Sequence, residues 1–284
     1  MAQLVSLNLE LTAPYDWSLL VKFFSARVIP GVDHVVANTY SRTISMGRGT
    51  GSLTISPAAK ALSARVHFTG SINEELVSKK LRRLANTDAP IGEISKHFAR
   101  DKILAPLIRK RLGLRVPGVW DPFELGVRAI LGQQVSVAGA TTLTGRVALK
   151  FGRKIKTSLP DLTHLFPTAA TMAEANLSGM GLTTRRAATI TGFAKAVCAN
   201  PGLLDSSKKL DEFVAGLVSL DGFGPWTAHY MAMRLGYTDA FPASDLGIRK
   251  ALAMAPENEV IRIAEPWRPY RANAAMHLWM SLGD

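Results

Sequence analysis

The spacing of hydrophobic residues divides the chain into a short strand-rich region and a long helical region. In the first 70 residues, apolar and polar residues alternate as they do in half-buried strands, and the expected strands are 4–11, 39–46, 51–55 and 64–68. Residues 17–27 follow the helical period instead. We therefore predict a small sheet with one helix packed on it.

From residue 73 onward the apolar residues follow the helical period. Gly and Pro residues separate the periodic segments, as they do at helix ends. The expected helices are 73–87, 91–98, 106–112, 122–132, 137–151, 169–175, 184–199, 209–220, 225–236, 246–254, 261–265 and 267–280. The pattern predicts a mainly α protein with a small α+β N-terminal domain, residues 1–71, and a helical region, residues 72–284.

The charge of the chain changes this picture more than its composition does. Hydrophobic residues make up 47% of the 284 residues and charged residues 20%, as in ordinary globular proteins. The net charge is +12, and residues 71–150 hold 14 Lys and Arg against 7 Asp and Glu. This favours a polyanionic partner, nucleic acid first and an anionic membrane second, although solubility alone could explain it. We expect the basic run at residues 79–83 to be a solvated helix face.

The single cysteine, Cys198, excludes a disulfide framework and any cysteine-ligated zinc or iron–sulfur site, since each needs several thiolates. The N-terminus lacks a leader pattern, and no apolar stretch approaches the roughly 20 residues that span a bilayer. We expect a monomeric, cytoplasmic, nucleoid-associated protein with no membrane partner.

Residues 217–228 read LVSLDGFGPWTA and hold the most informative turn. One expected helix ends at Leu220, and the next begins at Pro225, a residue that suits a first helical turn. Between them Gly222 and Gly224 allow backbone geometry that a Cβ would resist. The N–H groups of such a helix start attract phosphate. The turn is therefore either a clamp for a DNA backbone or an ordinary helix connection.

Asp245 lies 21 residues after Gly224, at the start of another expected helix. It could be a capping residue, a role that Ser244 could also fill. It could instead be a carboxylate at the mouth of a pocket. Breaking an N-glycosidic bond builds positive charge on the sugar, and a carboxylate stabilises that charge and orients or deprotonates water.

Several passages, in order, resemble the bacterial 3-methyladenine DNA glycosylase II (AlkA) family of the helix-hairpin-helix DNA glycosylase superfamily. They are PYDWSLLVKFFSAR, PGVWDPFELGVRAILGQQVSVAGA, GLTTRRAATI, WTAHYMAMR, FPASDLGIRK and WRPYRANAAMHLW. The resemblance implies the helix-hairpin-helix glycosylase fold, with the hairpin at residues 210–235 and an active-site cleft between two helical subdomains. It also implies duplex DNA containing alkylated bases as the partner.

The resemblance also implies a role for individual residues. Asp245 matches the catalytic Asp, and Gln134 matches the wedge that fills the gap of a flipped base. The base pocket is expected from Trp226, Tyr230, Trp279, Phe23 and Gln133, and contact with the DNA backbone from Gly222, Phe223, Gly224 and Thr227. No cofactor is expected to be required, but carbonyls of Val218, Leu220 and Phe223 could hold a monovalent cation, Na or K. Each aromatic residue could instead serve core packing, and the sequence alone favours that role for Tyr230 and Trp279.

The chemistry of alkylated purines gives the aromatic residues a function. Such a base is a cation, which an indole face attracts by about 0.5–2 kcal/mol, and it is flipped out of the duplex before it is removed. Bifunctional relatives have a Lys where this chain has Trp226. We therefore predict a monofunctional glycosylase that uses water and leaves an abasic site.

The chain departs from the family at three places. Gln134 stands where the family's main member has Leu, Ser244 replaces a second Asp, and Met280 replaces an aromatic residue. These changes leave the lesion range open. One alternative is a glycosylase for deaminated or other neutral lesions, which would need hydrogen bonds to the base from a pocket that we expect to be poor in polar side chains. Another is a non-enzymatic DNA-binding protein, which would need neither Asp245 nor an aromatic pocket.

Overall fold

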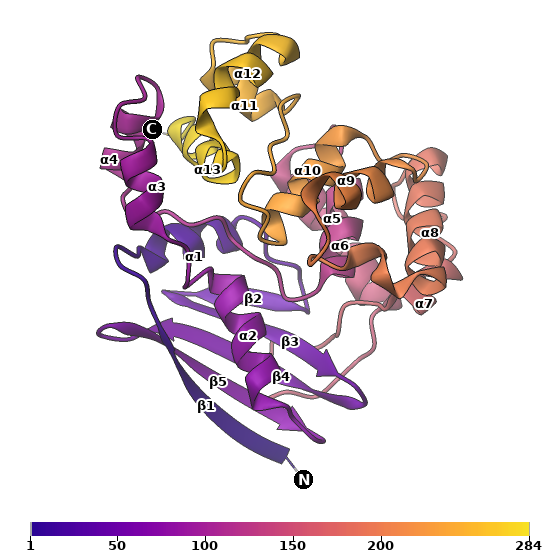
Figure 1. The fold of residues 1–284 in the computed structure, drawn as a ribbon. Helices are drawn as coiled ribbons and strands as arrows, with labels where there is room; N and C mark the ends of the chain where they lie inside the picture. Colours follow the sequence, from indigo (N-terminus) through magenta and orange to yellow (C-terminus); the bar gives the residue numbers. More distant parts are fainter. Residues whose placement is uncertain (1, 284) are drawn as a thin grey trace.

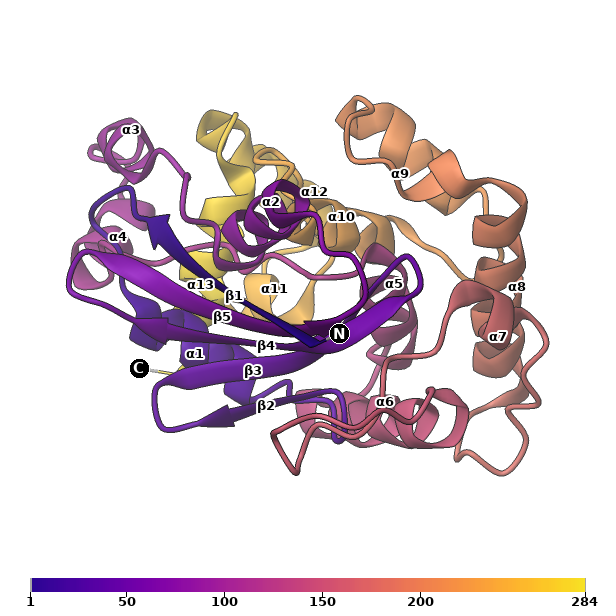
Figure 2. The ribbon, with the colours of Figure 1, turned by 90° about the horizontal axis from the view of Figure 1, so that it is seen from below.

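A five-stranded antiparallel sheet forms the N-terminal part of the computed structural model, which describes residues 2–283. The strands run in the order β1-β5-β4-β3-β2 (Figure 2). They are β1 (Ala2–Glu10), β2 (Asp33–Val36), β3 (Thr39–Met46), β4 (Gly49–Pro57) and β5 (Ala61–Thr69). The pattern predicted four of them and missed β2, whose four residues are too few to show alternation.

One face of the sheet is apolar and the other is polar. In β5 the buried residues alternate with exposed ones, and the register pairs Val66 with Leu53 and Ala64 with Ile55. This arrangement is common in antiparallel sheets that have water on one side. Helices α1 (Trp17–Ser25) and α2 (Glu74–Ala85) share the core of the apolar face, and Asp16 caps α1 through the Ser18 N–H at 2.9 Å.

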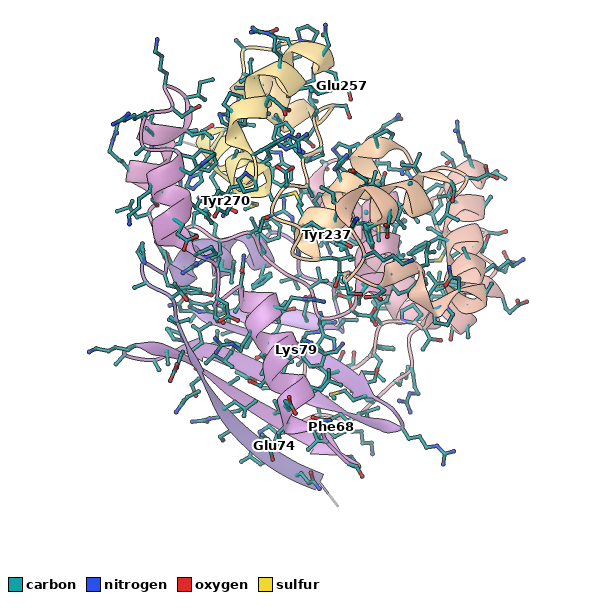
Figure 3. All side chains as sticks on the ribbon, viewed as in Figure 1. Phe68, Glu74, Lys79, Tyr237, Glu257 and Tyr270 are labelled. Carbon is teal, nitrogen blue, oxygen red and sulfur yellow. The ribbon has the colours of Figure 1, made fainter. Side chains whose placement is uncertain are left out.

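The remaining helices lie on the side of that core away from the sheet, with α11 and α12 farthest from it (Figure 1). Phe68 in the sheet and Glu257 in the last group mark the two ends of the molecule (Figure 3). The helices are α3 (Ile91–His97), α4 (Leu104–Lys110), α5 (Pro122–Leu131), α6 (Val137–Phe151), α7 (Ala169–Ala173), α8 (Thr184–Ala199), η1 (Pro201–Leu204), α9 (Leu210–Val218), α10 (Pro225–Arg234), α11 (Leu246–Ala251), α12 (Glu257–Ala264), η2 (Glu265–Trp267) and α13 (Arg271–Ser281).

The helical prediction is confirmed for the existence of these α-helices and is wrong at some ends. Helix α12 begins at Glu257, four residues before the predicted start, because Pro256 stands at its N-cap and Glu257 and Glu259 suit its first turn. Helix α13 begins four residues after the predicted start, since the short helix η2 and Pro269 precede it. Within residues 2–283, no helix is long and apolar enough to cross a membrane.

The basic run of α2 is a solvated face only in part. Lys79 and Arg83 are exposed, and Arg82 forms an ion pair with the exposed Asp88. Lys80 instead donates a hydrogen bond to the Trp120 carbonyl at 3.0 Å. That residue therefore fastens α2 to the segment before α5.

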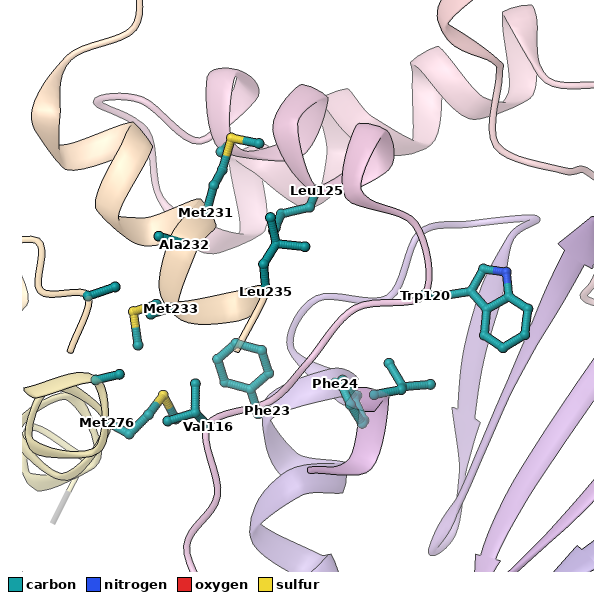
Figure 4. Packing of buried hydrophobic residues seen from close by; sticks show 14 of the residues in the cluster. Phe23, Phe24, Val116, Trp120, Leu125, Met231, Ala232, Met233, Leu235 and Met276 are labelled. Atoms are coloured by element: carbon teal, nitrogen blue, oxygen red, sulfur yellow. The ribbon is translucent and has the colours of Figure 1, made fainter. Parts of the chain in front are cut away.

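The sheet and the helical region share one hydrophobic core. Phe23 of α1 belongs to it together with Leu235 and Met276 from the C-terminal half (Figure 4). A buried ion pair also joins β3 to α5, with the Arg42 guanidinium donating two hydrogen bonds to Glu124 at 2.6 and 3.2 Å. These contacts fix α1 and α5 relative to each other, and both helices border the site described next.

Candidate active site

The helix-hairpin-helix consists of α9, a turn over residues 219–224, and α10. Gly222 has φ +82°, and a Cβ there would lie 2.2 Å from the Thr189 hydroxyl, so this position requires glycine. Gly224 has φ −95°, which other residues adopt readily, and a Cβ there would meet nothing within 4 Å. The conformational argument is thus confirmed for Gly222 and wrong for Gly224, which instead leaves an open surface at the start of α10.

The side chains predicted to contact the DNA backbone hold the hairpin together. Phe223 is buried, with its ring centroid 5.1 Å from that of Phe193. Thr227 is also buried, and its hydroxyl accepts a hydrogen bond from Gln133. No side chain of residues 2–283 caps α10, so the N–H groups of its first turn remain for an anion.

Gln133 binds the hairpin. Its side-chain amide donates to the Gly222 carbonyl at 2.9 Å and to the Thr227 hydroxyl at 3.0 Å. Arg186 donates to the Gln133 carbonyl at 2.6 Å. The loop between α5 and α6 is therefore fastened to both the hairpin and α8.

Asp245 combines the two roles that the sequence left open. It is the N-cap of α11, where its Oδ1 accepts the Ile248 N–H at 3.0 Å. The same oxygen accepts the indole N–H of Trp279 at 2.7 Å, and Oδ2 accepts the indole N–H of Trp226 at 2.8 Å. Three donors thus fix the orientation of one carboxylate, and no Lys or Arg of residues 2–283 forms an ion pair with it.

The indoles also form an aromatic group around Tyr230. Trp226 is parallel to Tyr230, with centroids 5.4 Å apart and an angle of 4°, and Trp279 lies 6.3 Å from Tyr230 at 54°. Gly247 makes room for this arrangement, because a Cβ there would lie 3.0 Å from Trp279 Cδ1 and 3.0 Å from Asp245 Oδ1. No sequence pattern points to Gly247, since its neighbour Trp279 lies on another helix.

These groups line a cavity of about 340 Å³, within the range of small-molecule sites. Two predicted pocket residues do not belong to its lining: Gln133 binds the hairpin, and Phe23 is a core residue 7% exposed. The cavity is lined by Trp226, Tyr230, Trp279, Asp245, Arg27, Arg128, Ala129, Gly132, Val135, Val137 and Ala140.

The expectation of a pocket poor in polar side chains is wrong, because Arg27 and Arg128 border it. Arg27 follows α1 and Arg128 lies in α5, so only the fold brings them together. The Arg27 guanidinium lies 3.7 Å from the centre of the Phe23 ring. A hint was available in the sequence, since Arg27 is four residues after Phe23 in a segment already assigned to the pocket.

Charges shift the pKa values at this end of the cavity. Burial, together with repulsion from Arg234 and Arg128, lowers the pKa of Arg27 to about 10. Burial alone would raise the pKa of Tyr230, but the charges of Arg234, Arg27 and Arg128 outweigh it and lower that pKa. Arg234 also donates a hydrogen bond to the Tyr230 hydroxyl at 3.0 Å.

Gln134 lies between Gly132 and Val135, which line the cavity, although it is not itself part of the lining. It is exposed, with φ +57°, in the loop between α5 and α6. Val135 and Val137 follow it, are exposed themselves, and line the cavity. This position suits a side chain that enters the space of a flipped base.

The carbonyls assigned to a monovalent cation belong to the last turn of α9 and the hairpin turn. Leu220 O already accepts the Phe223 N–H at 3.0 Å, but a carbonyl has a second lone pair. The carbonyls at a helix end lack intrahelical donors, so the oxygen set fits such an ion. Among residues 2–283, no group of three His, Cys, Asp or Glu side chains could hold a metal ion.

Known proteins show the same combination of domains and fold. Residues 6–121 match the AlkA N-terminal domain, and residues 127–258 match the HhH-GPD superfamily base excision DNA repair proteins. The first match runs past the predicted domain boundary at residue 71 and includes α2, α3 and α4. The solved 3-methyladenine DNA glycosylase from Archaeoglobus fulgidus has a TM-score of 0.83 and 25% identity, with 96% of this chain and 97% of that chain covered.

Two curated relatives match nearly the whole chain. The probable bifunctional transcriptional activator/DNA repair enzyme AlkA of Mycobacterium tuberculosis is 32% identical over 98% of this chain, which spans 57% of that relative's length. DNA-3-methyladenine glycosylase 2 of Escherichia coli is 31% identical, with 95% of each chain covered. The chain therefore belongs to the AlkA family, within the HhH-GPD superfamily of base excision DNA repair proteins.

Proposed function

We propose that the chain hydrolyses the N-glycosidic bond of alkylated purines, of the 3-methyladenine and 7-methylguanine type, in duplex DNA. The observation that carries this proposal is Asp245, held by two indole N–H groups at the edge of a cavity large enough to admit a purine base. The names of the relatives from Escherichia coli and Archaeoglobus fulgidus support the same substrate class.

The reaction begins with the damaged base flipped into the cavity while Gln134 enters the vacated space. The bond between C1′ and the base nitrogen breaks, and its electron pair leaves with the base, which neutralises an alkylated cation. Asp245 stabilises the positive charge on the sugar. A water molecule forms the new C1′–O bond and gives its proton to Asp245, leaving an abasic site.

Trp226 supports water as the nucleophile. Its indole N–H is bound to Asp245, and it offers no amine to attack C1′. No lysine lines the cavity in the part of the chain that the structure describes. Borohydride should therefore trap no covalent complex with DNA, and a trapped complex would refute the monofunctional assignment.

The hairpin binds the DNA backbone through the uncapped start of α10. A monovalent cation on carbonyls of Val218, Leu220 and Phe223 would add positive charge beside a phosphate. Binding to duplex DNA should fall steeply with salt, as phosphate-dominated binding does. A monomer that acts on the nucleoid in the cytoplasm completes the proposal.

The test is an excision assay on duplexes that contain 3-methyladenine or 7-methylguanine. Asp245→Asn keeps the size of the side chain and should retain DNA binding while base release falls by at least about 100-fold. The matched control is Asp161→Asn, since that carboxylate is exposed on the surface. Retained excision by Asp245→Asn, or no excision by the unchanged protein, would refute the proposed function.

A further inference from the structure

Helix α8 holds the loop between α5 and α6 through one arginine in its first turn, Arg186. The Arg186 guanidinium donates a hydrogen bond to the Gln133 carbonyl at 2.6 Å. Its Nε is buried and has no partner among residues 2–283, so this carbonyl is the acceptor that holds the guanidinium. A hydrogen bond from a charged donor is stronger than one between neutral groups. The bond therefore fixes the peptide group that joins Gln133 to Gln134.

That peptide group precedes a residue in a rare conformation. Gln134 has φ +57°, in the left-handed region that residues with a Cβ seldom adopt. Such a conformation persists where the surrounding contacts over-determine it. Here Arg186 binds the Gln133 carbonyl, while the Gln133 amide donates to the Gly222 carbonyl and the Thr227 hydroxyl. The direction in which the exposed Gln134 side chain points depends on these contacts.

The same face of α8 also supports the hairpin turn. Thr189 is three residues after Arg186, so the two side chains lie on one face of the helix. The turn packs directly on this face, since a Cβ at Gly222 would lie 2.2 Å from the Thr189 hydroxyl. Helix α8, the hairpin and Gln133 thus form a closed set of contacts. This set places Gln134 at a fixed position relative to the hairpin.

Two other roles for Arg186 would give different behaviour. A phosphate contact would contribute to binding of every duplex, because phosphate contacts carry no information about the bases. A bond that only supports the fold would have an effect that does not depend on Gln134. The geometry favours a third role, since the guanidinium binds the carbonyl directly before Gln134.

We propose that Arg186 is a positioning residue for base flipping, which keeps Gln134 in the left-handed conformation that directs its side chain into the gap of the flipped nucleotide. The inference rests on the proposed function, in which Gln134 is the wedge. Without the hydrogen bond from Arg186, the loop relaxes towards negative φ and the Gln134 side chain points elsewhere. The loop must then be ordered during binding, which lowers the affinity for flipped DNA.

The experiment is a double-mutant cycle that measures binding to a duplex with a tetrahydrofuran abasic analogue and to the undamaged duplex of the same sequence. Arg186→Met removes the donor and keeps a long side chain. It should weaken binding to the abasic-analogue duplex by about 5–10-fold, as for one lost hydrogen bond, and binding to the undamaged duplex by less. In a Gln134→Ala protein the same change should cost less than about twofold, because Arg186 acts through Gln134. Arg186→Lys keeps a charged donor and should retain most of the affinity.

A second background separates positioning from general support of the fold. Asparagine adopts positive φ more readily than glutamine and also carries an amide. Arg186→Met should therefore weaken binding to the abasic-analogue duplex by less than about threefold in a Gln134→Asn protein. The matched control is Arg146→Met, which removes an arginine that donates to the Met180 carbonyl. Arg146 lies about 15 Å along α6 from Ser136, so its loss should change neither affinity.

Multiplying losses in the cycle would mean that Arg186 acts independently of Gln134, and the proposal would fail. It would also fail if Arg186→Met weakened binding to the two duplexes equally, as loss of a phosphate contact would. If Arg186→Met does not fold, Arg186→Gln takes its place in the cycle. A loss through Gln134→Ala but none through Arg186→Met would overturn this inference alone. No preference of the unchanged protein for the abasic-analogue duplex would refute the wedge role in the proposed function, and this inference with it.

Discussion

The two ends of the cavity are built in different ways. At the carboxylate end, Asp245 receives three hydrogen bonds, so its position is fixed before any substrate arrives. At the arginine end, Arg128 retains a buried donor without a partner among the described residues. The carboxylate end is therefore held by hydrogen bonds within the protein, whereas the arginine end keeps a buried donor that no described residue satisfies.

The largest loss of base release is expected from variants that remove a hydrogen bond to Asp245. Trp226→Phe and Trp279→Phe each remove an indole N–H and keep an aromatic ring, so the carboxylate loses one hydrogen bond at a time. Each bond to a charged group contributes about 1.5–3 kcal/mol, so 7-methylguanine release should fall about 10–150-fold per variant.

The matched control is Trp120→Phe, which changes a buried tryptophan that does not contact Asp245. Binding to an abasic-analogue duplex should stay unchanged in all three variants. Full release by Trp279→Phe would mean that this indole N–H does not orient the carboxylate.

The two ends also differ in how far the sequence predicts them. Asp245 and Trp226 were found because they follow the hairpin at short, recognisable intervals. Arg27 and Arg128 lie 101 positions apart and meet only where α1 packs beside α5. Charge counts along the chain cannot reveal such a cluster, since neither arginine belongs to a basic run.

A second prediction concerns the pH dependence of protein stability through α13, the helix that carries Trp279 to the carboxylate end. His277 lies on α13, two residues before Trp279, and burial together with the charge of Arg111 lowers its pKa to about 4. The unfolded chain binds this proton near pH 6.5. The contribution of His277 to the free energy of unfolding is therefore fully present above pH 6.5. It is lost as the pH falls towards 4, by about 2 kcal/mol between pH 7 and pH 5.

Urea unfolding at the two pH values measures this loss. In His277→Gln the amide can still donate a hydrogen bond, but it does not titrate. Between pH 7 and pH 5 the free energy of unfolding of this variant should therefore fall by about 2 kcal/mol less than that of the unchanged protein. An identical pH dependence in both proteins would show that His277 is not the group that titrates.

A third prediction separates stability from activity at Gly247. Alanine has the higher helix propensity, by about 1 kcal/mol at most, since that figure applies to helix interiors and Gly247 is the second residue of α11. Its Cβ would nevertheless lie 3.0 Å from Trp279 Cδ1 and from Asp245 Oδ1, so the carboxylate and indole must move apart by a few tenths of an ångström. We expect about tenfold slower base release and only a small change in stability, because the gain in helix propensity and the crowding oppose each other.

The matched control is Gly92→Ala in α3, where a Cβ meets nothing within 4 Å. Thermal unfolding and single-turnover release should be measured on both variants. If Gly247→Ala released the base at the full rate, the close contact between Trp279 and Asp245 would not matter for catalysis.

The hairpin shows the same limit of sequence reasoning at a smaller scale. The motif identified Gly222 correctly, because a short turn makes its demand for positive φ visible in the sequence. It misassigned the reason for Gly224, and it could not show that Gln133 binds the hairpin rather than lining the cavity. Gln133 and Gly222 are 89 positions apart in the sequence, and their hydrogen bond depends on how α5 packs beside α10.

The weakest effect is expected at Gln134, which is exposed in the loop between α5 and α6, directly before the cavity residue Val135. Its exposed amide can fill the gap of a flipped nucleotide and bind the base left without a partner. Gln134→Ala should weaken binding to an abasic-analogue duplex by about 2–10-fold, the range of a single hydrogen bond, and binding to undamaged duplex by less. Alanine has the same steric cost as glutamine at φ +57°, so the substitution does not change the conformational preference of the loop backbone.

The matched control is Gln3→Ala, which removes an exposed amide from β1 and should change neither affinity. Equal losses on the two duplexes would place Gln134 among general DNA contacts, because only a residue that enters the gap distinguishes flipped from stacked DNA.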